Sequence, residues 1–280
     1  MVPEIALAKI DKAADLTTVC MLGCGVTTGI GAVRNTTAVE PGASVAVFGL
    51  GAIGIAVIQA AKLAGAGRIF AIDVNPAKFE LAKQLGATDC LDPADHADSI
   101  QSVLVKQTQW GVDYTFDCTG NTEVMRPAHP NPNPNPNPNP NPNPNPNPNP
   151  NPDPDPDPDP DPNPDPDPDP DPNPNPNQVM RSALEAAHRG WGVSCVIGVA
   201  AAGQEISTRP FQLVTGRKWV GTAFGGVKSR DGVPQLVEEY MQGALPLDHF
   251  VSERYHGLAS IPQAIEAMHG GKVLRAVVTY

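Results

Sequence analysis

The sequence lacks several features that define whole classes of protein. It has no cluster of lysine and arginine, so it lacks the cationic surface that displaces counterions from a nucleic acid. No apolar run approaches the roughly 20 residues that cross a bilayer. The first residues, "MVPEIALAKIDKAADL", have neither the basic nor the apolar region of a signal peptide. We therefore expect a cytoplasmic protein with no nucleic-acid partner and no membrane partner.

Cysteines are few, and their number is odd. The five are scattered through apolar segments, at Cys20, Cys24, Cys90, Cys118 and Cys195. This pattern is typical of reduced thiols rather than of a disulfide framework. Cys20 and Cys24 share one face if their segment is helical, but catalytic zinc needs three protein ligands and no further ligand cluster is nearby. Spacing alone therefore favours buried, inert thiols over a metal site.

Proline is abundant, but almost all of it lies in one segment. Of the 33 prolines, 25 fall between Pro127 and Pro176, mostly in a strict Asn-Pro and Asp-Pro alternation. Nine aspartates of this repeat supply most of the net charge of −11, so the acidic balance says little about what the rest of the chain binds. Proline at every second position removes backbone donors and fixes φ, which excludes the repeat from a sheet. We expect a solvated, polyproline-II-like loop.

The flanks of the repeat indicate that it interrupts a domain. Val-Met-Arg occurs at 124–126 and again at 179–181. Removing one copy with everything between leaves an uninterrupted strand, helix and strand, so we interpret the repeat as an insertion into a βαβ unit. Closing a loop of about 50 residues costs on the order of 3 to 4 kcal/mol, which a domain of this size tolerates.

Short apolar runs alternate with amphipathic stretches on both sides of the repeat. Asn75 and Pro76 are a helix cap and a first helical residue. Because the strands are too apolar to face water on either side, we predict an α/β fold with a doubly wound parallel sheet. The predicted strands are 44–50, 68–74, 88–92, 112–120 and 193–199, and the predicted helices are 51–66, 75–87, 97–108 and 177–190.

The motif "GLGAIG" (49–54) follows a predicted strand and opens a predicted helix. In that context, glycines let a pyrophosphate approach the helix N-terminus, while Asp73 at the end of the next strand can accept the ribose hydroxyls. The alternative is that these glycines serve packing alone. Asp73 would repel a ribose 2′-phosphate, which favours NAD over NADP. Lys78 contacts the adenosine ribose or is simply a solvated surface residue.

Four longer runs resemble one family: "GCGVTTGIGAV", "VAVFGLGAIG", "AIDVN" and above all "GQEISTRPFQLVTGRKWVGTAFGGVKSR" (203–230). They resemble the medium-chain zinc alcohol dehydrogenases, in particular class III, the glutathione-dependent formaldehyde or S-(hydroxymethyl)glutathione dehydrogenases. The resemblance implies a Rossmann domain, NAD and zinc as cofactors, an alcohol-type substrate, a role in formaldehyde detoxification, and a homodimer formed through about 207–221.

The resemblance also assigns roles to residues. It implies that Cys24 is a catalytic-zinc ligand and that Thr28 lies beside the nicotinamide, whereas Cys20 matches no ligand. It assigns the pyrophosphate and adenosine contacts to Gly49, Leu50, Gly51, Ala52, Ile53, Gly54, Asp73, Lys78, Cys118, Thr119, Gly120 and Arg275. It assigns the carboxamide contacts to Ile197, Gly198, Val199, Thr222, Ala223 and Phe224.

In the family, a catalytic domain with the other zinc ligands precedes the glycine motif, and we expect this chain to begin too late to contain it. Apolar residues at 273–278 are then partly uncovered. We expect NAD binding but negligible turnover from this chain alone. The expected organisation is a catalytic-domain edge (1–25), the first part of the NAD-binding domain (26–126), the repeat (127–178), the rest of that domain (179–223) and a segment that packs on the catalytic domain (224–280).

Two other interpretations stay open. In the first, the chain is a non-catalytic NAD-binding or interaction module with a proline-rich spacer, because extended proline tracts dock into aromatic grooves. Alternatively, it is the product of a truncated or interrupted gene, because a dipeptide repeat corresponds to a six-base unit that can expand by slippage.

Overall fold

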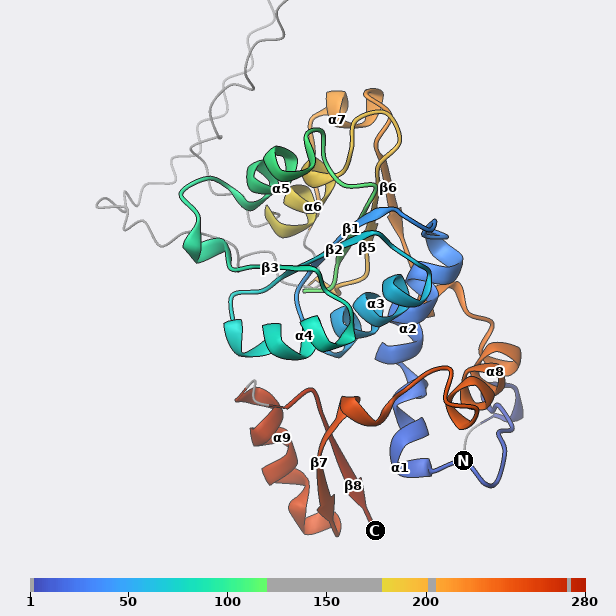
Figure 1. The fold of residues 1–280 in the computed structure, drawn as a ribbon. Coiled ribbons are helices and arrows are strands. Elements are labelled where there is room, and N and C mark those ends of the chain that lie inside the picture. The colour runs from blue at the N-terminus through green and yellow to red at the C-terminus, as the bar shows by residue number, and fades with distance from the viewer. Residues whose placement is uncertain (1–2, 120–177, 201–204, 271–272) are drawn as a thin grey trace, which may run out of the picture. The chain divides into compact units, whose positions relative to one another are not determined.

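The computed structural model describes residues 3–119, 178–200, 205–270 and 273–280, and within them six short strands form one sheet. The strand order is β3-β2-β1-β4-β5-β6 (Figure 1). Every neighbouring pair is parallel. The strands are β1 Ser44–Phe48, β2 Arg68–Ile72, β3 Asp89–Leu91, β4 Tyr114–Asp117, β5 Val193–Val196 and β6 Lys218–Gly221.

Helices cover both faces of this sheet. The α-helices are α1 Leu16–Val19, α2 Gly25–Gly31, α3 Ala52–Leu63, α4 Phe79–Leu85, α5 Ile100–Thr108, α6 Gln178–Ala186, α7 Pro210–Val214, α8 Ser229–Met241 and α9 Ile261–His269. Because alternate residues of a strand point to opposite sides, Val45 and Val47 pack with α2 and α3, whereas Ala46 and Phe48 pack with α5 and α6. Figure 1 shows these two helical layers on opposite sides of the strands. The predicted doubly wound sheet is confirmed.

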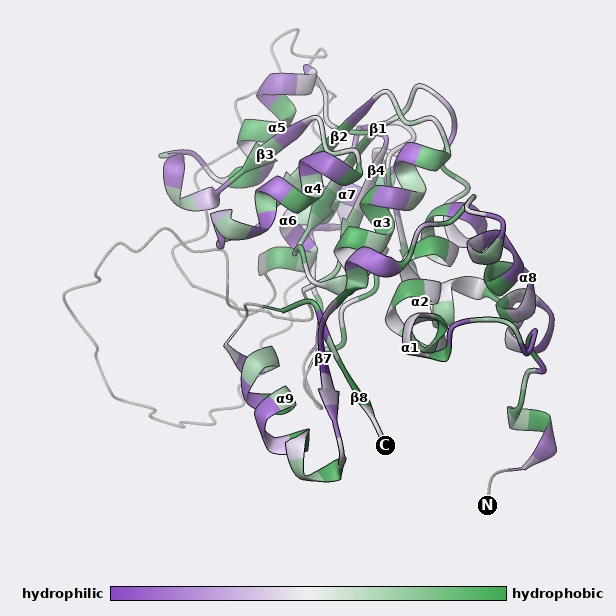
Figure 2. Ribbon diagram, turned by 60° about the horizontal axis from the view of Figure 1, so that its bottom comes forward, coloured by the Kyte–Doolittle hydropathy of each residue, from purple (hydrophilic) through white to green (hydrophobic). Residues whose placement is uncertain are grey.

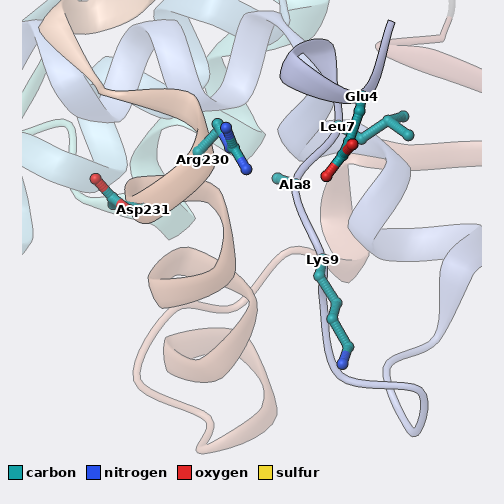
Figure 3. Close-up of a pocket in the computed structure, with 6 residues that line it drawn as sticks. All are labelled: Glu4, Leu7, Ala8, Lys9, Arg230 and Asp231. Atoms are coloured by element: carbon teal, nitrogen blue, oxygen red, sulfur yellow. The ribbon is translucent and has the colours of Figure 1, made fainter. Parts of the chain in front are cut away.

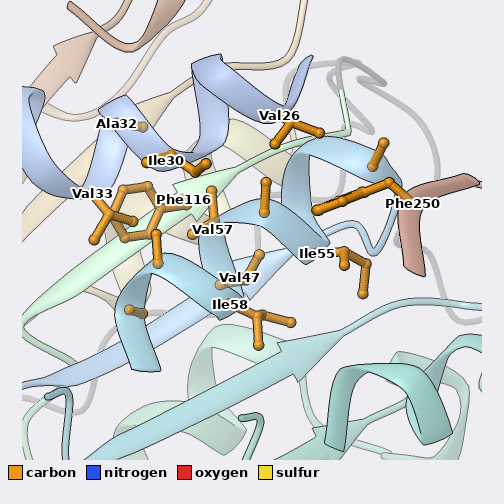
Figure 4. Close-up of a cluster of buried hydrophobic side chains, with 14 of the residues drawn as sticks. Val26, Ile30, Ala32, Val33, Val47, Ile55, Val57, Ile58, Phe116 and Phe250 are labelled. Carbon is orange, nitrogen blue, oxygen red and sulfur yellow. The ribbon is translucent and has the colours of Figure 1, made fainter. Parts of the chain in front are cut away.

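Helix α3 is buried on nearly all sides because it lies between the sheet and α2. A side-chain carbon on Gly29 of α2 would lie 2.7 Å from Cβ of Ala56 in α3, so the two backbones approach too closely for a larger residue. Side chains of both helices join one cluster with Val47 and Phe116 of the sheet (Figure 4). This contact fixes α2, which carries Thr28, against the strands.

Local sequence signals explain where two helices begin and end. The Asn75 side chain accepts a hydrogen bond from the Ala77 N–H, and Pro76 takes the first helical position of the short helix η4 (Pro76–Lys78), which leads into α4. This predicted start is confirmed. Helix α6 ends at Ala186 rather than at the predicted Gly190, because the His188 N–H donates to the carbonyl of Val112 on the neighbouring segment.

The C-terminal residues form a smaller layer that shares the main core. Strands β7 (Val251–His256) and β8 (Arg275–Thr279) pair in parallel next to α9. Leu236 of α8 and Phe250 belong to the cluster built around α3. In β8, Val277 is buried and Val278 is half-buried, so the expected uncovering of this strand is partial.

Apolar side chains are nevertheless exposed on the C-terminal helix. Ile261, Ile265 and Met268 of α9 are each more than a third exposed, and the helix is of mixed hydropathy (Figure 2). Among the described residues no single helix is long and apolar enough to span a membrane. Segments 16–23 and 25–36 are together long and apolar enough, but they meet at a bend of 60° and α2 is buried in the core.

Candidate functional site

The residues that directly follow five of the strands stand in one row. Phe48 pairs with both Ile72 and Asp117, Asp117 pairs with Val196, and Val196 pairs with Gly221. In a parallel sheet these strand ends meet at one edge, where open α/β folds bind ligands. The next residues along the chain are Gly49, Asp73, Cys118, Ile197 and Thr222. All five were predicted as site residues, and the fold brings them to a single edge.

The three glycines of the turn after β1 are required for different reasons. Gly49 has φ +89°, and a side-chain carbon there would lie 2.7 Å from Cγ2 of Thr119. A side-chain carbon on Gly54 would lie 1.9 Å from the Gly49 carbonyl oxygen. At Gly51, however, φ is −78° and nothing lies within 4 Å of the position that such a carbon would occupy. Packing accounts for Gly49 and Gly54, but not for Gly51.

Gly51 is the N-cap of helix α3 and provides no side-chain hydrogen bond to its first N–H groups. These donors and the helix dipole favour an anion, and the absent side chain leaves space for one. The side chains of Leu50 and Ala52 are buried, and Ile53 is half-buried. The turn therefore fits the pyrophosphate of a dinucleotide through its backbone.

Asp73 is buried, and both of its carboxylate oxygens accept hydrogen bonds. Its Oδ2 accepts hydrogen bonds from the Leu50 N–H at 2.7 Å and from Lys78 Nζ at 3.0 Å, and its Oδ1 accepts from the Asn75 N–H at 2.9 Å. The carboxylate thus ties the glycine turn to the end of β2. Lys78 forms an ion pair with Asp73, and its contact to an adenosine ribose stays a prediction.

Helix α2 presents its N-terminus to the glycine turn. The Thr28 hydroxyl donates to the carbonyl of Cys24 at 3.0 Å and is buried. A side-chain carbon on Gly25 would lie 3.3 Å from Nη2 of Arg275 and 3.3 Å from Cγ1 of Ile53. Arg275, at the start of β8, therefore lies beside the first turn of α3, where the resemblance implies a pyrophosphate contact.

The end of β4 combines a buried acid with two site residues. Asp117 Oδ1 accepts hydrogen bonds from the N–H and hydroxyl of Thr119, whereas Oδ2 has no hydrogen-bond partner among the described residues. Burial raises the pKa of Asp117. Burial also raises the pKa of the Cys118 thiol well above its usual value, which makes this thiol inert. Gly120 lies outside the described residues.

The remaining predicted residues follow β5 and β6. The N–H groups of Ile197 and Gly198 both donate to the carbonyl of Asp117 at 2.9 Å, and Val199 is exposed. After β6, Thr222 and Phe224 are half-buried and Ala223 is exposed. The two segments follow the neighbouring strands β5 and β6, so both can contact the same part of a bound ligand.

The two cysteines near α2 do not share a helical face. The chain breaks between the short helix η2 (Cys20–Gly23) and α2, because Cys24 has φ −156° and ψ −93°. Both thiols are exposed, so the interpretation of Cys20 as a buried thiol is wrong. All five cysteines are free. No three His, Cys, Asp or Glu side chains gather into a possible metal site within the described residues, so these residues do not by themselves complete a zinc site.

A cavity of about 790 Å³ lies away from this edge of the sheet. It opens between the N-terminal segment and the start of α8, and Figure 3 shows its lining residues on these two separate segments. They are Glu4, Leu7, Ala8, Lys9, Arg230 and Asp231. None of them belongs to the row at the strand ends, so the cavity is not part of the candidate site.

Two side chains at this edge were not predicted. Thr36 shares a 2.7 Å hydrogen bond with Thr222, and Asn35 donates to the carbonyl of Gly225 at 3.2 Å. In the sequence, "NTT" at the end of a helix gives no signal for contacts to residues so far along the chain.

Comparisons with known proteins show what this chain is similar to. The family model "Zinc-binding dehydrogenase" matches residues 52–129. An S-(hydroxymethyl)glutathione dehydrogenase from Synechocystis sp. is 51% identical over the whole of this chain, which spans 61% of that protein. One from Haemophilus influenzae is 50% identical, and the chain spans 59% of it. The chain thus spans about three fifths of the length of the curated relatives it matches.

Solved structures show the same fold. An alcohol dehydrogenase zinc-binding domain protein from Burkholderia ambifaria is 27% identical with a TM-score of 0.70, and the match covers 97% of this chain and 57% of that one. Benzyl alcohol dehydrogenase from Acinetobacter calcoaceticus is 24% identical with a TM-score of 0.71, over 97% of this chain and 59% of that one. The relatives that match along the entire chain show that it is similar to the zinc-containing alcohol dehydrogenases, in particular to the S-(hydroxymethyl)glutathione dehydrogenases, and the solved structures show that it shares their fold.

Proposed function

We propose that this chain binds NAD at the carboxyl edge of its sheet. The observation that carries the proposal is the open space at Gly51, above the uncapped N-terminus of α3. Packing gives no reason for a glycine there, whereas a pyrophosphate does. Arg275 stands beside the same helix start and supplies a positive charge.

We assign the adenosine end of NAD to Asp73 and Lys78. A buried carboxylate at the end of β2 accepts ribose hydroxyls and disfavours a 2′-phosphate. Because Asp73 already holds the Leu50 N–H and the Lys78 ammonium, its position is fixed before coenzyme binds. This preorganisation supports NAD rather than NADP.

NAD accepts a hydride when it is bound, and the residues of this chain orient it for that step. Thr28, buried in the middle of α2, packs beside the nicotinamide in this proposal, and the segments 197–199 and 222–224 hold its carboxamide. The proposed activity of the whole protein is NAD-dependent oxidation of S-(hydroxymethyl)glutathione or a related alcohol. Cys24 is its candidate zinc ligand, and its exposed thiol is open to further ligands.

Titration calorimetry with NAD and with NADP tests the binding proposal. We expect NAD to bind more tightly than NADP, and Gly51→Ala to weaken NAD binding at least tenfold while the unfolding midpoint stays unchanged, because the added methyl meets no protein atom. Equal NAD affinity of the variant and the parent chain would contradict the pyrophosphate assignment. With glutathione, formaldehyde, zinc and NAD, we expect negligible NADH formation by this chain alone, and turnover at a rate typical of such enzymes would refute that expectation.

The partner and location also belong to this proposal. We infer a homodimer formed through 207–221, supported by the position of β6 at the end of the sheet and by exposed Phe211 and Val214 on α7. Sedimentation equilibrium should give the mass of two chains, and a monomer at micromolar concentration would contradict the dimer. The proposed location is the cytoplasm.

A further inference from the structure

The loop after β6 has an unusual backbone. Phe224 has φ +52°, and Gly225 and Gly226 both have φ +65°. Three successive residues thus lie in the left-handed region, which disfavours a bulky side chain such as that of Phe224. Such conformations persist only where the surroundings hold them, and they are concentrated at functional sites.

The surroundings that hold this loop belong to the far end of helix α2. There the helix widens into a single π turn, η3 (Ala32–Thr36). The hydroxyls of Thr36 and Thr222 are 2.7 Å apart, and the Asn35 amide donates to the carbonyl of Gly225 at 3.2 Å. π turns are rare and often mark functional positions.

Backbone contact reinforces these two hydrogen bonds. A side-chain carbon on Gly31 would lie 2.3 Å from the Gly225 carbonyl oxygen, so the helix and the loop touch directly. The loop is therefore held at Gly225 by Gly31 and Asn35, and at Thr222 by Thr36. Helix α2 consequently joins two parts of the candidate site, with Thr28 in its middle and the loop at its end.

We propose that Asn35 and Thr36 are positioning residues for recognition of the nicotinamide carboxamide. The inference rests on the proposed function, which assigns the carboxamide to Thr222, Ala223 and Phe224. A hydroxyl pair and an amide that fix both ends of a strained loop keep its backbone donors and acceptors aligned before NAD arrives. Preorganised groups bind more tightly because the ligand need not order them.

The test compares NAD with ADP-ribose, which lacks the nicotinamide and its carboxamide. We expect Thr36→Val to weaken NAD binding about five- to tenfold in calorimetry and to leave ADP-ribose binding within about twofold, as loss of one positioning hydrogen bond predicts. Thr36→Ser should restore NAD binding because it retains the hydroxyl. Equal weakening of both ligands, or of neither, overturns the inference.

The chain offers a matched control one residue away. The Thr37 hydroxyl donates to the carbonyl of Ala32 at 2.9 Å, within the same helix end. Unlike Thr36, it forms no hydrogen bond with the described residues of the loop. Thr37→Val should therefore affect NAD and ADP-ribose equally. If Thr37→Val discriminates between the ligands as Thr36→Val does, the effect belongs to the helix end rather than to the Thr222 bond, and the inference fails.

Hydrogen exchange in the chain without ligand separates this inference from the proposed function. Thr36→Val should speed amide exchange at 222–226 at least fivefold without a matching change in β1 and β4. Unchanged exchange overturns the positioning role even if NAD binds. Failure of the parent chain to bind ADP-ribose instead contradicts the coenzyme site itself, whatever the exchange result.

Discussion

Strands β1 and β2 are joined by one continuous buried helix, whereas the connection from β4 to β5 passes through residues 120–177 before it reaches α6. In both pairs the strands are parallel and their last residues lie opposite each other at the carboxyl edge. In the first half, α3 is held by apolar contact on nearly all sides. In the second half, α6 is also largely buried, and Val179, Ala183 and Ala186 join the cluster on its face of the sheet.

The second half relies on a buried charged side chain where the first half relies on close backbone packing. Arg217 donates to the carbonyls of Ala187 at 2.7 Å and Glu185 at 3.2 Å, and so joins the end of α6 to the residue before β6. These are the carbonyls that a helix C-terminus leaves without intrahelical donors. The C-terminal end of α6 is thus tied to the start of β6 by contacts that do not depend on the connection before the helix.

Replacing Arg217 should cause the largest loss in the free energy of unfolding. Arg217→Met retains much of the apolar volume but leaves buried carbonyls unpaired, so we expect a loss of about 3 kcal/mol in the free energy of unfolding. Urea denaturation followed by circular dichroism measures it. Arg189→Met, at an exposed arginine close by, should cost less than about 0.5 kcal/mol. Similar losses in both variants would mean that α6 does not depend on this cap.

Gly54→Ala applies the same test to the first half. The added carbon would lie 1.9 Å from the Gly49 carbonyl oxygen, so the turn or the helix must shift. We expect a loss of about 2 kcal/mol, in the range of overpacked cores. Gly51→Ala is the matched control, because its new carbon meets nothing within 4 Å. Equal stability of the two variants would show that the turn tolerates displacement and that close packing does not define this half.

Much of this arrangement was predictable from local patterns. The strands 44–50, 68–74 and 193–199 contain β1, β2 and β5, because parallel strands covered on both faces are continuous apolar runs. The row of site residues follows from the ends of these strands. Strand β6, "KWVG", was not predicted because its residues are exposed or half-buried and give no apolar run.

Contacts between segments far apart in the chain could not be predicted from the sequence. The Thr36 and Thr222 bond exists because Gly31 lets α2 touch the loop after β6, and no local pattern encodes that approach. The error at Cys20 has a related cause. Its apolar neighbours suggested burial, but the break at Cys24 turns the segment so that its thiol is exposed.

Deleting Pro127–Arg181, which keeps one Val-Met-Arg, tests whether the long connection costs stability. The deletion shortens the link between β4 and α6 about tenfold, so we expect a gain of about 2 kcal/mol from loop-closure entropy. Differential scanning calorimetry and NAD titration of both chains measure the effect. A loss of stability would show that the removed residues support α6, and would end the view that the two halves differ only in the length of a connection.

The smallest expected effects are the pH dependences of two aspartates, one in each half. In the first half, hydrogen bonds from Arg68 at 2.8 and 2.9 Å hold the pKa of Asp89 below its usual value. This stabilisation is present above the unfolded pKa of about 4 and is lost as pH falls through the folded pKa. Because both side chains are partly exposed, the contribution is at most about 1 kcal/mol.

Asp117, in the second half, should respond to pH with the opposite sign. Burial raises its pKa, so the folded state favours the protonated acid, and stability is greatest below the unfolded pKa of about 4 and declines as pH rises through the folded pKa. Urea midpoints between pH 3.5 and 7 measure both slopes. Asp117→Asn should remove the decline toward neutral pH, whereas Asp89→Asn should remove part of the loss toward acid pH. If both substitutions change the slope in the same direction, the unpartnered Oδ2 of Asp117 does not carry the burial cost assigned to it, and the two halves do not differ in how they hold a carboxylate.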